Sequence, residues 1–476
     1  MVSKQYAEFP GRICILGFGS IGQGVLPLLL RHIGVSHENV TIVSADPYGA
    51  DIALKYGVNF IKRKITRANY KEQMSRLIGK GDFLLNLSVD VSSIALIELC
   101  REVGALYLDT CIEPWIGGYD EPKLSMAERT NYALREKALK LQTGIPAPTA
   151  VVAHGANPGL VSHLLKEALL NLRTDLGMNG KKPTTKEEWA ELAQKLGVKV
   201  VHIAERDNQR SYIPKQVGEF VNTWSIGGFY AEGNQPAELG WGSHEKYFPA
   251  DGREHKNGRK SSIYLEQPGI LTQVRSWTPL EGAYHGFIIT HNESISIADY
   301  FTVKDGEGKV TYRPTVHYAY HPCDGAVLSL HEVAGKNGKI QAKHKLIVEE
   351  IMPGGVDELG VLLMGHGKGA YWYGSQLSID QTRVLAPYNN ATSLQVAASV
   401  LGAFVWAIEN PEKGLVEADD IDHTRVLEIA KPYLGIITGE YSKWTPLEGR
   451  TPTDSPLFVE DIDESDPWQF KNFRVS

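Results

Sequence analysis

The sequence predicts an α/β fold, in which a doubly wound parallel sheet is joined to a second, mostly antiparallel α+β domain. Strand-like and helix-like segments alternate over residues 11–150, as in a sheet with crossover helices. From residue 198 to about 385 the pattern changes to short β-rich runs with many glycines and aromatic residues. A strongly apolar helical stretch follows near 389–410, and we expect it to return and pack against the first domain.

The first strand leads into a Gly-x-Gly-x-x-Gly turn. The apolar run Ile13–Leu16 predicts a buried strand, and residues 25–32 predict a helix. Gly17 makes the tight turn, Gly19 lets a pyrophosphate approach the backbone, and Gly22 lets helix and strand pack closely. The helix N-terminus offers N–H groups and positive dipole to the phosphates. The motif therefore predicts a Rossmann-type dinucleotide site, which also takes in Phe18, Ser20 and Ile21.

A second strand, 40–45, ends in an acid that predicts the identity of the cofactor. Asp46 lies 24 residues beyond Gly22, close to the ~20 residues expected before a ribose-binding acid. The next three residues, 47–49, include no arginine. Because a carboxylate at this position would repel a 2′-phosphate, the sequence predicts NAD rather than NADP.

The remaining elements of the first domain follow in order. We expect helices at 49–56, 69–78, 92–103 and 127–143, and strands at 58–61, 82–88, 105–109 and 150–154. Ligands in such sheets gather at the carboxyl ends of the strands. The candidates at these ends are Asn86, Ser88, Asp109 and Thr110 for the cofactor, with Asp90 and Glu113 beside them.

A second glycine-rich junction connects this sheet to a helix at 160–172. It contains Asn157 and Pro158 between two glycines, and it is well placed to meet the nicotinamide end of the cofactor. Asn157 could also cap the helix, and proline suits a first turn. The two interpretations are compatible. We therefore expect Asn157 and Pro158 at the cofactor, and we draw the first domain as 1–157, the second as 158–388, and C-terminal helices with a wrapping tail as 411–476.

Composition and charge argue against several classes of function. The net charge of −7 argues against a nucleic-acid partner. None of the four cysteines forms a Cys-x-x-Cys pair, which favours a reducing, cytoplasmic location. Residues 1–10 lack the apolar core of a signal peptide, and the apolar stretch 394–408 is shorter than the ~20 residues of a membrane span. The histidines show no metal-ligand spacing, so we expect no metal.

Residues 219–248 combine aromatic rings with carboxylates. The rings are Trp224, Phe229, Tyr230, Trp241, Tyr247 and Phe248, and the acids are Glu219, Glu232, Glu238 and Glu245. Together such groups suit an alkylammonium ion, because the carboxylate neutralises the charge and the ring attracts it. Each residue taken singly fits a structural role better, and for the whole segment both interpretations stay open.

Two smaller features also allow two interpretations. His291 and His321 lie near Glu293 and Asp324 in the sequence and would form either a site or structural pairs. Lys368, flanked by glycines, would be either a Schiff-base lysine or an exposed turn residue.

Several longer motifs carry a family resemblance. They are GFGSIGQG (17–24), SADP (44–47), NLSVD (86–90), DTCIEPW (109–115), HGANPGLVSH (154–163), AERD (204–207), NTWSIGGFYAEG (222–233) and GAYWYGSQLS (369–378). Over essentially its whole length the chain resembles the bacterial homospermidine synthases, members of the saccharopine dehydrogenase-like superfamily.

This resemblance implies a redox-neutral use of NAD. Putrescine would be oxidised to an imine, a second putrescine would displace ammonia, and the same NADH would reduce the product to sym-homospermidine. Spermidine could replace the donor and release diaminopropane. The resemblance also suggests a homodimer.

The resemblance further implies which residues form the site. Glu205 would transfer the proton, Trp224 would stabilise the iminium by a cation–π contact, and Asn157 and His291 would lie beside them. The acids that would anchor ammonium groups are Asp90, Glu113, Glu232 and Asp357.

Two rival functions remain. A reductive condensing dehydrogenase of the saccharopine or carboxynorspermidine type would need an arginine clamp for carboxylates, and the acidic–aromatic region offers mainly Arg206 and Arg210. A non-catalytic NAD sensor would keep the glycine motif and Asp46 but would not need Glu205 with Trp224.

Overall fold

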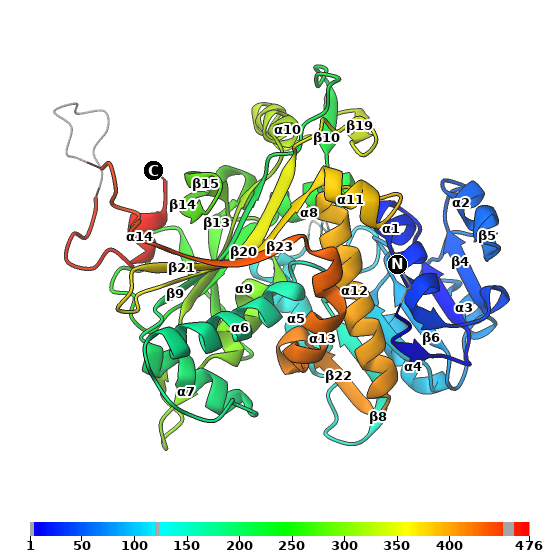
Figure 1. Ribbon diagram of the computed structural model, residues 1–476, viewed down its shortest axis with the longest axis horizontal. Helices are drawn as coiled ribbons and strands as arrows, with labels where there is room; N and C mark the ends of the chain where they lie inside the picture. Colours follow the sequence, from blue (N-terminus) through cyan, green and yellow to red (C-terminus); the bar gives the residue numbers. More distant parts are fainter. Residues whose placement is uncertain (1–3, 120, 122, 451–460, 476) are drawn as a thin grey trace.

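The computed structural model describes residues 4–119, 121, 123–450 and 461–475, which form two sheets with helices around them (Figure 1). The first sheet has seven parallel strands in the order β22-β8-β7-β6-β2-β4-β5. Their bounds are β2 Ile13–Leu16, β4 Val40–Ser44, β5 Asn59–Lys62, β6 Phe83–Asn86, β7 Leu106–Asp109, β8 Ala147–Val152 and β22 Lys413–Glu417. The central strands are buried and mostly apolar, as expected for a parallel sheet with helices on both faces. The predicted Rossmann-type sheet is therefore confirmed.

The helices of this half are α1 Ser20–His32, α2 Ala50–Lys55, α3 Tyr70–Ser75, α4 Ser93–Val103 and α5 Asn131–Leu139. The prediction that the first helix starts near residue 25 was wrong, because α1 begins directly after Gly19. Gly22 and Gly24 therefore lie inside the helix. A Cβ at Gly22 would lie 2.8 Å from the Gly17 oxygen, and one at Gly24 would lie 2.2 Å from Oδ1 of Asn389. These glycines permit close packing.

The second sheet has ten strands, and it is mostly antiparallel as predicted. Its main path is β12-β13-β11-β18-β9-β20-β21-β23, and β14 and β15 pair beside it. The bounds are β9 Val200–Asp207, β11 Pro236–Gly240, β12 Gly252–Glu254, β13 Ser262–Pro268, β14 Gln273–Thr278, β15 Gly282–Phe287, β18 Thr315–His321, β20 Val356–Met364, β21 Ala370–Ser378 and β23 Ile436–Ser442. Strands β9 and β18 at its centre are parallel, and this pairing positions the site described below.

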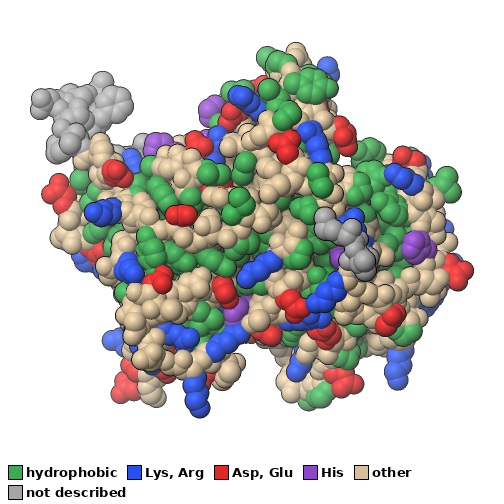
Figure 2. Space-filling model, in the orientation of Figure 1, with side chains coloured by type: hydrophobic (Ala, Val, Ile, Leu, Met, Phe, Trp, Pro, Cys, Tyr) green, Lys and Arg blue, Asp and Glu red, His purple; other side chains and the backbone are tan. Residues whose placement is uncertain are grey.

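Helices and short strand pairs complete the second half. The helices are α6 Leu160–Asp175, α7 Lys186–Leu196, α8 Ile226–Asn234, α9 Asn292–Tyr300, α10 Asp324–Gly335 and α11 Ile379–Leu385, and the short parallel pair is β10 Glu219–Asn222 with β19 Lys343–Leu346. In Figure 1, α10, β10 and β19 project together from the top of the molecule. Figure 2, drawn in the same orientation, shows acidic and basic side chains interspersed over the visible face of the molecule.

Helix α12, Ala391–Glu409, connects the two halves. It packs against α1 and against α13, His423–Ala430, and it stands between the two sheets in Figure 1. By length and hydropathy alone this helix could cross a membrane, but 89% of its apolar window is buried inside the fold. Helix α12 lies where the sequence predicts a returning helix, and burial in the core accounts for its apolar character.

The chain after residue 410 contributes to both sheets. Strand β22 pairs with β8 of the first sheet, and β23 pairs with β21 of the second. The prediction of helices and a tail for this segment therefore missed two strands. Part of the predicted tail, 451–460, lies outside the described residues, and the chain ends in α14, Phe470–Phe473, whose phenylalanines are buried. The domain boundaries at 157 and 388 stay predictions.

Candidate active site

A groove of about 1100 Å³ runs along the carboxyl edge of the first sheet. Its walls include the glycine turn, Asp46, Ser88 and Asp90. The second half of the chain closes it with Ser225, Ile226 and residues 344–346. Ligands of doubly wound sheets bind at this edge, so the groove lies where the sequence predicts a dinucleotide.

The glycine turn, the start of α1 and Asp46 all suit a bound dinucleotide. Gly17 has a φ of 91°, a conformation that favours glycine. A Cβ placed on Gly19 would meet nothing within 4 Å, so the backbone there faces open space. No side chain caps the N-terminus of α1, and its first turn has no acid, which leaves its N–H groups to a phosphate. Asp46 accepts the Tyr48 N–H at 2.9 Å, which orients its carboxylate in the groove wall.

Some predicted cofactor residues do not line this groove. Asn86 donates from Nδ2 to the Tyr107 hydroxyl at 3.1 Å, and that hydroxyl donates to Asp109 at 2.7 Å. Asp109 also accepts the Ala153 N–H at 2.7 Å. Burial raises the pKa of Asp109 to about 7. In this structure Asn86 and Asp109 therefore tie adjacent strand ends together. Thr110, Asn157 and Pro158 are also outside the groove lining.

Three buried carboxylates gather where β9 meets its neighbours, and we call Glu205, Asp207 and Asp357 the first acidic cluster. Glu205 and Asp207 lie two residues apart on β9, so both point to one face. Strand β20 places Asp357 opposite Asp207, and β18 places Tyr320 opposite Glu205. The pairing of three strands therefore assembles the cluster from segments far apart in the chain.

Glu205 connects this cluster to the cofactor half. Nδ2 of Asn157, at the junction between β8 and α6, donates to Oε2 of Glu205 at 2.8 Å. The Tyr318 hydroxyl donates to the same oxygen. Burial raises the pKa of Glu205 to about 7, although these two hydrogen bonds act to lower it. Glu205 can therefore gain or lose a proton near neutral pH.

Asp207 and Asp357 are held by hydroxyl groups. Asp207 accepts from the Thr223 hydroxyl at 2.7 Å, and Asp357 accepts from the Thr392 hydroxyl of α12 at 2.5 Å. Burial raises the pKa of both acids, and Glu205 further raises that of Asp357. Oδ1 of Asp357 is buried without a hydrogen-bond partner among the described residues. This oxygen is suited to an N–H donor of a bound ligand.

Trp224 lies beside the first acidic cluster, directly after Thr223. Its Nε1 donates to the Tyr320 hydroxyl at 3.0 Å, and the rings of Tyr320 and Tyr318 stack with centroids 5.0 Å apart. The indole is partly buried. The sequence reasoning missed both tyrosines, because their place in the site depends on the parallel register of β18 with β9.

We call Glu113, Glu232 and Glu293 the second acidic cluster: Glu232 and Glu293 lie beside His291, and Glu113 lies near Glu232. Nε2 of His291 is 3.1 Å from Glu232, and its Nδ1 is 3.3 Å from Glu293. Although burial opposes it, Glu293 and Glu232 raise the pKa of His291 to about 10, so this imidazole is protonated at neutral pH. Burial, Glu232 and Asp90 raise the pKa of Glu113 to about 8. The structure thus brings the predicted Asp90, Glu113, Glu232 and His291 together.

Of the two interpretations left open for residues 219–248, the structural one fits most of the segment. Trp224 and Glu232 are at the site. Glu238 accepts the N–H groups of Asn131 and Tyr132 at the start of α5. The other members form core or surface contacts: Phe229 is buried, Trp241 packs on Phe248 and Phe470, and Glu245 accepts from Thr315.

The two smaller alternatives are resolved by position. His291 lies in the site, whereas His321 hydrogen-bonds the Pro322 carbonyl and packs beside Tyr284. Lys368 donates to the Asp175 carbonyl oxygen at 3.0 Å and lies over the Tyr441 ring. Neither of these contacts involves the acidic clusters.

The arrangement can bind an amine and move its proton beside a dinucleotide. Buried carboxylates and an indole face offer favourable surroundings to an ammonium or iminium ion. A carboxyl group whose pKa lies near 7 is suited to general acid–base catalysis at neutral pH. The hydrogen bond from Asn157 places that group next to the sheet that forms the groove.

Comparison with known proteins agrees with this geometry. Residues 13–152 match the saccharopine dehydrogenase NADP binding domain, and residues 155–442 match the saccharopine dehydrogenase C-terminal domain. The chain is 54% identical to the homospermidine synthase of Blastochloris viridis, covering 99% of this chain and 98% of that protein. It is 52% identical to the homospermidine synthase of Mesorhizobium japonicum, covering 99% and 97%.

A solved structure extends the comparison to three dimensions. The crystal structure of the homospermidine synthase of Legionella pneumophila, in complex with NAD, superposes with a TM-score of 0.92. The two chains are 48% identical, and each is covered in full. Fold, sequence and site therefore lead to one conclusion: the chain belongs to the homospermidine synthase family, whose domains are those of the saccharopine dehydrogenases.

Proposed function

We propose that the chain is an NAD-dependent homospermidine synthase that joins two putrescine molecules into sym-homospermidine and releases ammonia. It would also accept spermidine as donor and then release diaminopropane. The observation that carries the proposal is the hydrogen bond from Asn157 to Glu205, which couples the cofactor half to a buried acidic site. When bound in the groove, NAD⁺ accepts a hydride from the amine-bearing carbon and, as NADH, returns it after condensation.

Glu205 is the proton acceptor in this proposal. A primary ammonium cannot release hydride, so the substrate nitrogen must first lose a proton. The carboxylate of Glu205 takes that proton, and Asn157 and Tyr318 hold it in place by donating to Oε2. The same group returns a proton when ammonia leaves.

Trp224 and the remaining acids stabilise positive charge. The face of Trp224 lies against the iminium, and its ring is fixed by the hydrogen bond to Tyr320. The unpartnered Oδ1 of Asp357 accepts a hydrogen bond from the distal ammonium group of the diamine. Asp90, Glu113 and Glu232 attract the second diamine, and protonated His291 limits the net negative charge around them. These side chains exclude dianionic substrates.

Partners and location follow from the same features. The substrates are small polyamines, and we propose a homodimer in the cytoplasm without nucleic-acid or membrane partners. The free cysteines Cys14, Cys100, Cys111 and Cys323 are compatible with a reducing compartment. A condensing dehydrogenase for carboxylated substrates is disfavoured, because Arg206 pairs with Glu281 at 3.2 Å and with Asp324 at 3.4 Å.

Product analysis with catalytic NAD⁺ tests the proposal. Purified protein is incubated with putrescine, and polyamines, ammonia and NADH are measured. We expect homospermidine and ammonia in equal amounts, far above the NAD⁺ supplied, without accumulating NADH. Stoichiometric NADH without homospermidine would indicate a simple amine dehydrogenase. No turnover would redirect the search to carboxylated substrates and to an NAD sensor.

A further inference from the structure

Two cations line the adenosine end of the groove beside Asp46. Arg63 and Lys64 both line it and are exposed. Strands β4 and β5 pair in parallel with Ser44 opposite Lys62, so Asp46 and Lys64 each lie two residues past the paired strand ends. The Arg63 N–H donates to the Ser44 carbonyl oxygen at 2.6 Å, which continues the pairing. The carboxylate and both cations therefore leave the same corner of the sheet.

The two cations at this corner are not held by acids of the described part of the chain. Arg63 donates to the neutral amide of Gln73, and neither Arg63 nor Lys64 makes an ion pair with a described residue. Asp46 is itself engaged through Oδ1 with the Tyr48 N–H. Two unpaired cations at a dinucleotide groove provide charge for an anionic group at that position.

We propose that Arg63 and Lys64 form a phosphate subsite at the 2′ position of the adenosine ribose. The carboxylate of Asp46 keeps NADP out of this subsite by repelling its 2′-phosphate. Acids at this position bind the ribose hydroxyl in NAD enzymes, and arginines accept the 2′-phosphate in NADP enzymes. This chain carries both the acid, Asp46, and nearby cations, Arg63 and Lys64. Discrimination against NADP therefore rests on one carboxylate. The inference deepens the proposed function and rests on its cofactor assignment.

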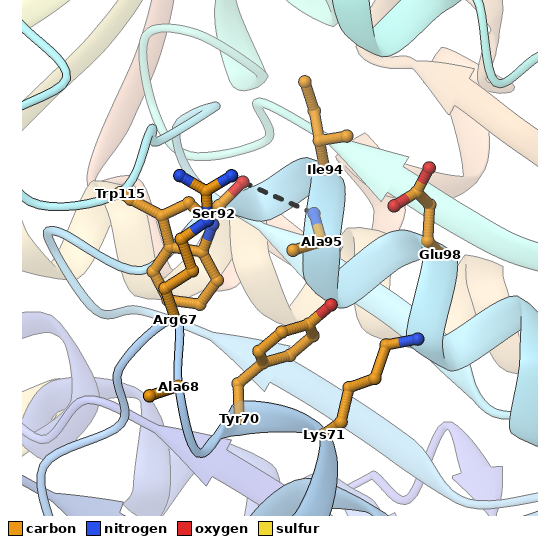
Figure 3. A pocket seen from close by; sticks show the side chains of 9 residues that line it. All are labelled: Arg67, Ala68, Tyr70, Lys71, Ser92, Ile94, Ala95, Glu98 and Trp115. Atoms are coloured by element: carbon orange, nitrogen blue, oxygen red, sulfur yellow. Dashed lines mark hydrogen bonds between the residues drawn. The ribbon is translucent and has the colours of Figure 1, made fainter.

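A third cation, Arg67, lies at a different part of the groove wall. It lines both the groove and an adjoining open pocket of about 500 Å³. Figure 3 shows Arg67 among the residues around this pocket, with Trp115 and with Ser92, the N-cap of α4. Lys71 lines only the adjoining pocket and lies 3.8 Å from Glu102. These two cations supply controls that differ from the subsite in position but not in charge.

Direct binding measurements test the subsite without any polyamine. The dissociation constants of NAD⁺ and NADP⁺ are measured by calorimetry for the native protein and for Asp46→Ser. We expect Asp46→Ser to bind NADP⁺ about tenfold more tightly or better, because one charge repulsion is removed. It should bind NAD⁺ more weakly. The gain should disappear in Asp46→Ser/Arg63→Ala/Lys64→Ala.

The controls decide between this subsite and general positive charge. Asp46→Ser with Arg67→Ala, or with Lys71→Ala, should keep the gain in NADP⁺ affinity. If the triple variant does not fold, Asp46→Ser/Arg63→Gln gives the same comparison. The proposal is overturned if Asp46→Ser binds NAD⁺ but gains nothing for NADP⁺, or if the gain survives removal of both cations. Failure of the native protein to bind NAD⁺ would instead refute the cofactor assignment.

Discussion

At the scale of single residues, the pKa of Glu205 connects the site with the pH dependence of the reaction. Burial raises this pKa to about 7, and the proposed role needs the deprotonated form. We therefore expect kcat/KM for putrescine to rise with pH through about 7, with a further rise near 8 as Glu113 ionises and binds substrate more tightly. Glu205→Gln should lower kcat by ~100-fold or more, which is the scale of general acid–base catalysis.

Glu113 supplies the control for this pH profile. Burial and neighbouring acids raise its pKa to about 8, and its proposed role is to attract substrate in its ionised form. Glu113→Gln should raise KM and keep the limb near pH 7. An unchanged rate and profile in Glu205→Gln would show that another group accepts the proton.

Trp224 is expected to affect turnover more than binding. Its ring acts on the charged intermediate, and a desolvated cation–π contact contributes about 2 kcal/mol. Trp224→Ala should therefore lower kcat by ~30-fold, and Trp224→Phe by less. Steady-state kinetics measures both. Trp241→Phe is the matched control, because Trp241 packs on Phe248 and Phe470. A normal kcat in Trp224→Ala would remove the proposed role.

Local motifs could be predicted from the sequence, whereas side chains joined by strand register could not. The glycine turn and Asp46 are encoded within one stretch, and the structure places both in the groove. Tyr318 contacts Glu205 across 113 residues, and no local pattern specifies that pairing. Arg63 directly follows β5, which pairs with the strand before Asp46, so the residues directly after Asp46 do not reveal it.

At the scale of elements, the N-terminus of α12 supports the site. Asn390 caps the helix by accepting the Ser393 N–H at 2.9 Å. Its Nδ2 also donates to the carbonyl oxygens of Thr223 and Ile347. One side chain thus caps the returning helix and holds the segment before Trp224. The sequence predicted this helix near 389–410, close to its observed bounds, but not the contacts of Asn390 with Thr223 and Ile347, because these residues lie far away in the chain.

Loss of this cap should affect stability and catalysis together. Asn390→Ala removes the cap, worth ~1 kcal/mol, and leaves two buried carbonyl groups with fewer partners. We expect the free energy of unfolding to fall by ~2–3 kcal/mol and kcat to decrease. Denaturant titration and kinetics measure both. Ser378→Ala, which removes the exposed cap of α11, should cost ~1 kcal/mol and leave kcat unchanged. Equal effects from both variants would contradict the proposed positioning.

At the scale of the whole molecule, Arg135 joins the two halves. It is buried on α5 and donates from Nε and Nη2 to Glu417 of β22, both at 2.7 Å. Nη2 also donates to Asp299 of α9 at 2.9 Å. A cation of the first half is therefore fixed to acids at the end of the first sheet and on the helix that follows His291.

Removal of this arginine should destabilise the protein strongly. Arg135→Ala leaves two acids without their buried partner, and such losses cost about 3–5 kcal/mol. Denaturant unfolding measures the change. Arg135→Met with Glu417→Gln should recover part of it, because the double variant leaves fewer uncompensated charges. A loss below ~1 kcal/mol in Arg135→Ala would show that packing alone holds the halves together.

The overall architecture was predictable to the extent that it follows chain order. Alternating strands and helices specified the first sheet, and the apolar segment specified the returning helix. The late strands β22 and β23 join sheets formed by much earlier segments. Their short, mixed sequences carry little period, so tertiary pairing rather than local propensity determines them.

The central claim is that one NAD takes a hydride from putrescine and returns it to the same carbon. Putrescine deuterated at both terminal carbons tests this most directly, with the protein, catalytic NAD⁺ and an excess of unlabelled NADH in solution. Mass spectrometry then counts the deuterium in the product. We predict homospermidine that retains all the deuterium of its two precursors. Product that lacks one deuterium would show that a hydride from the NADH in solution was delivered and would contradict the claim that the same bound NAD returns the hydride it took.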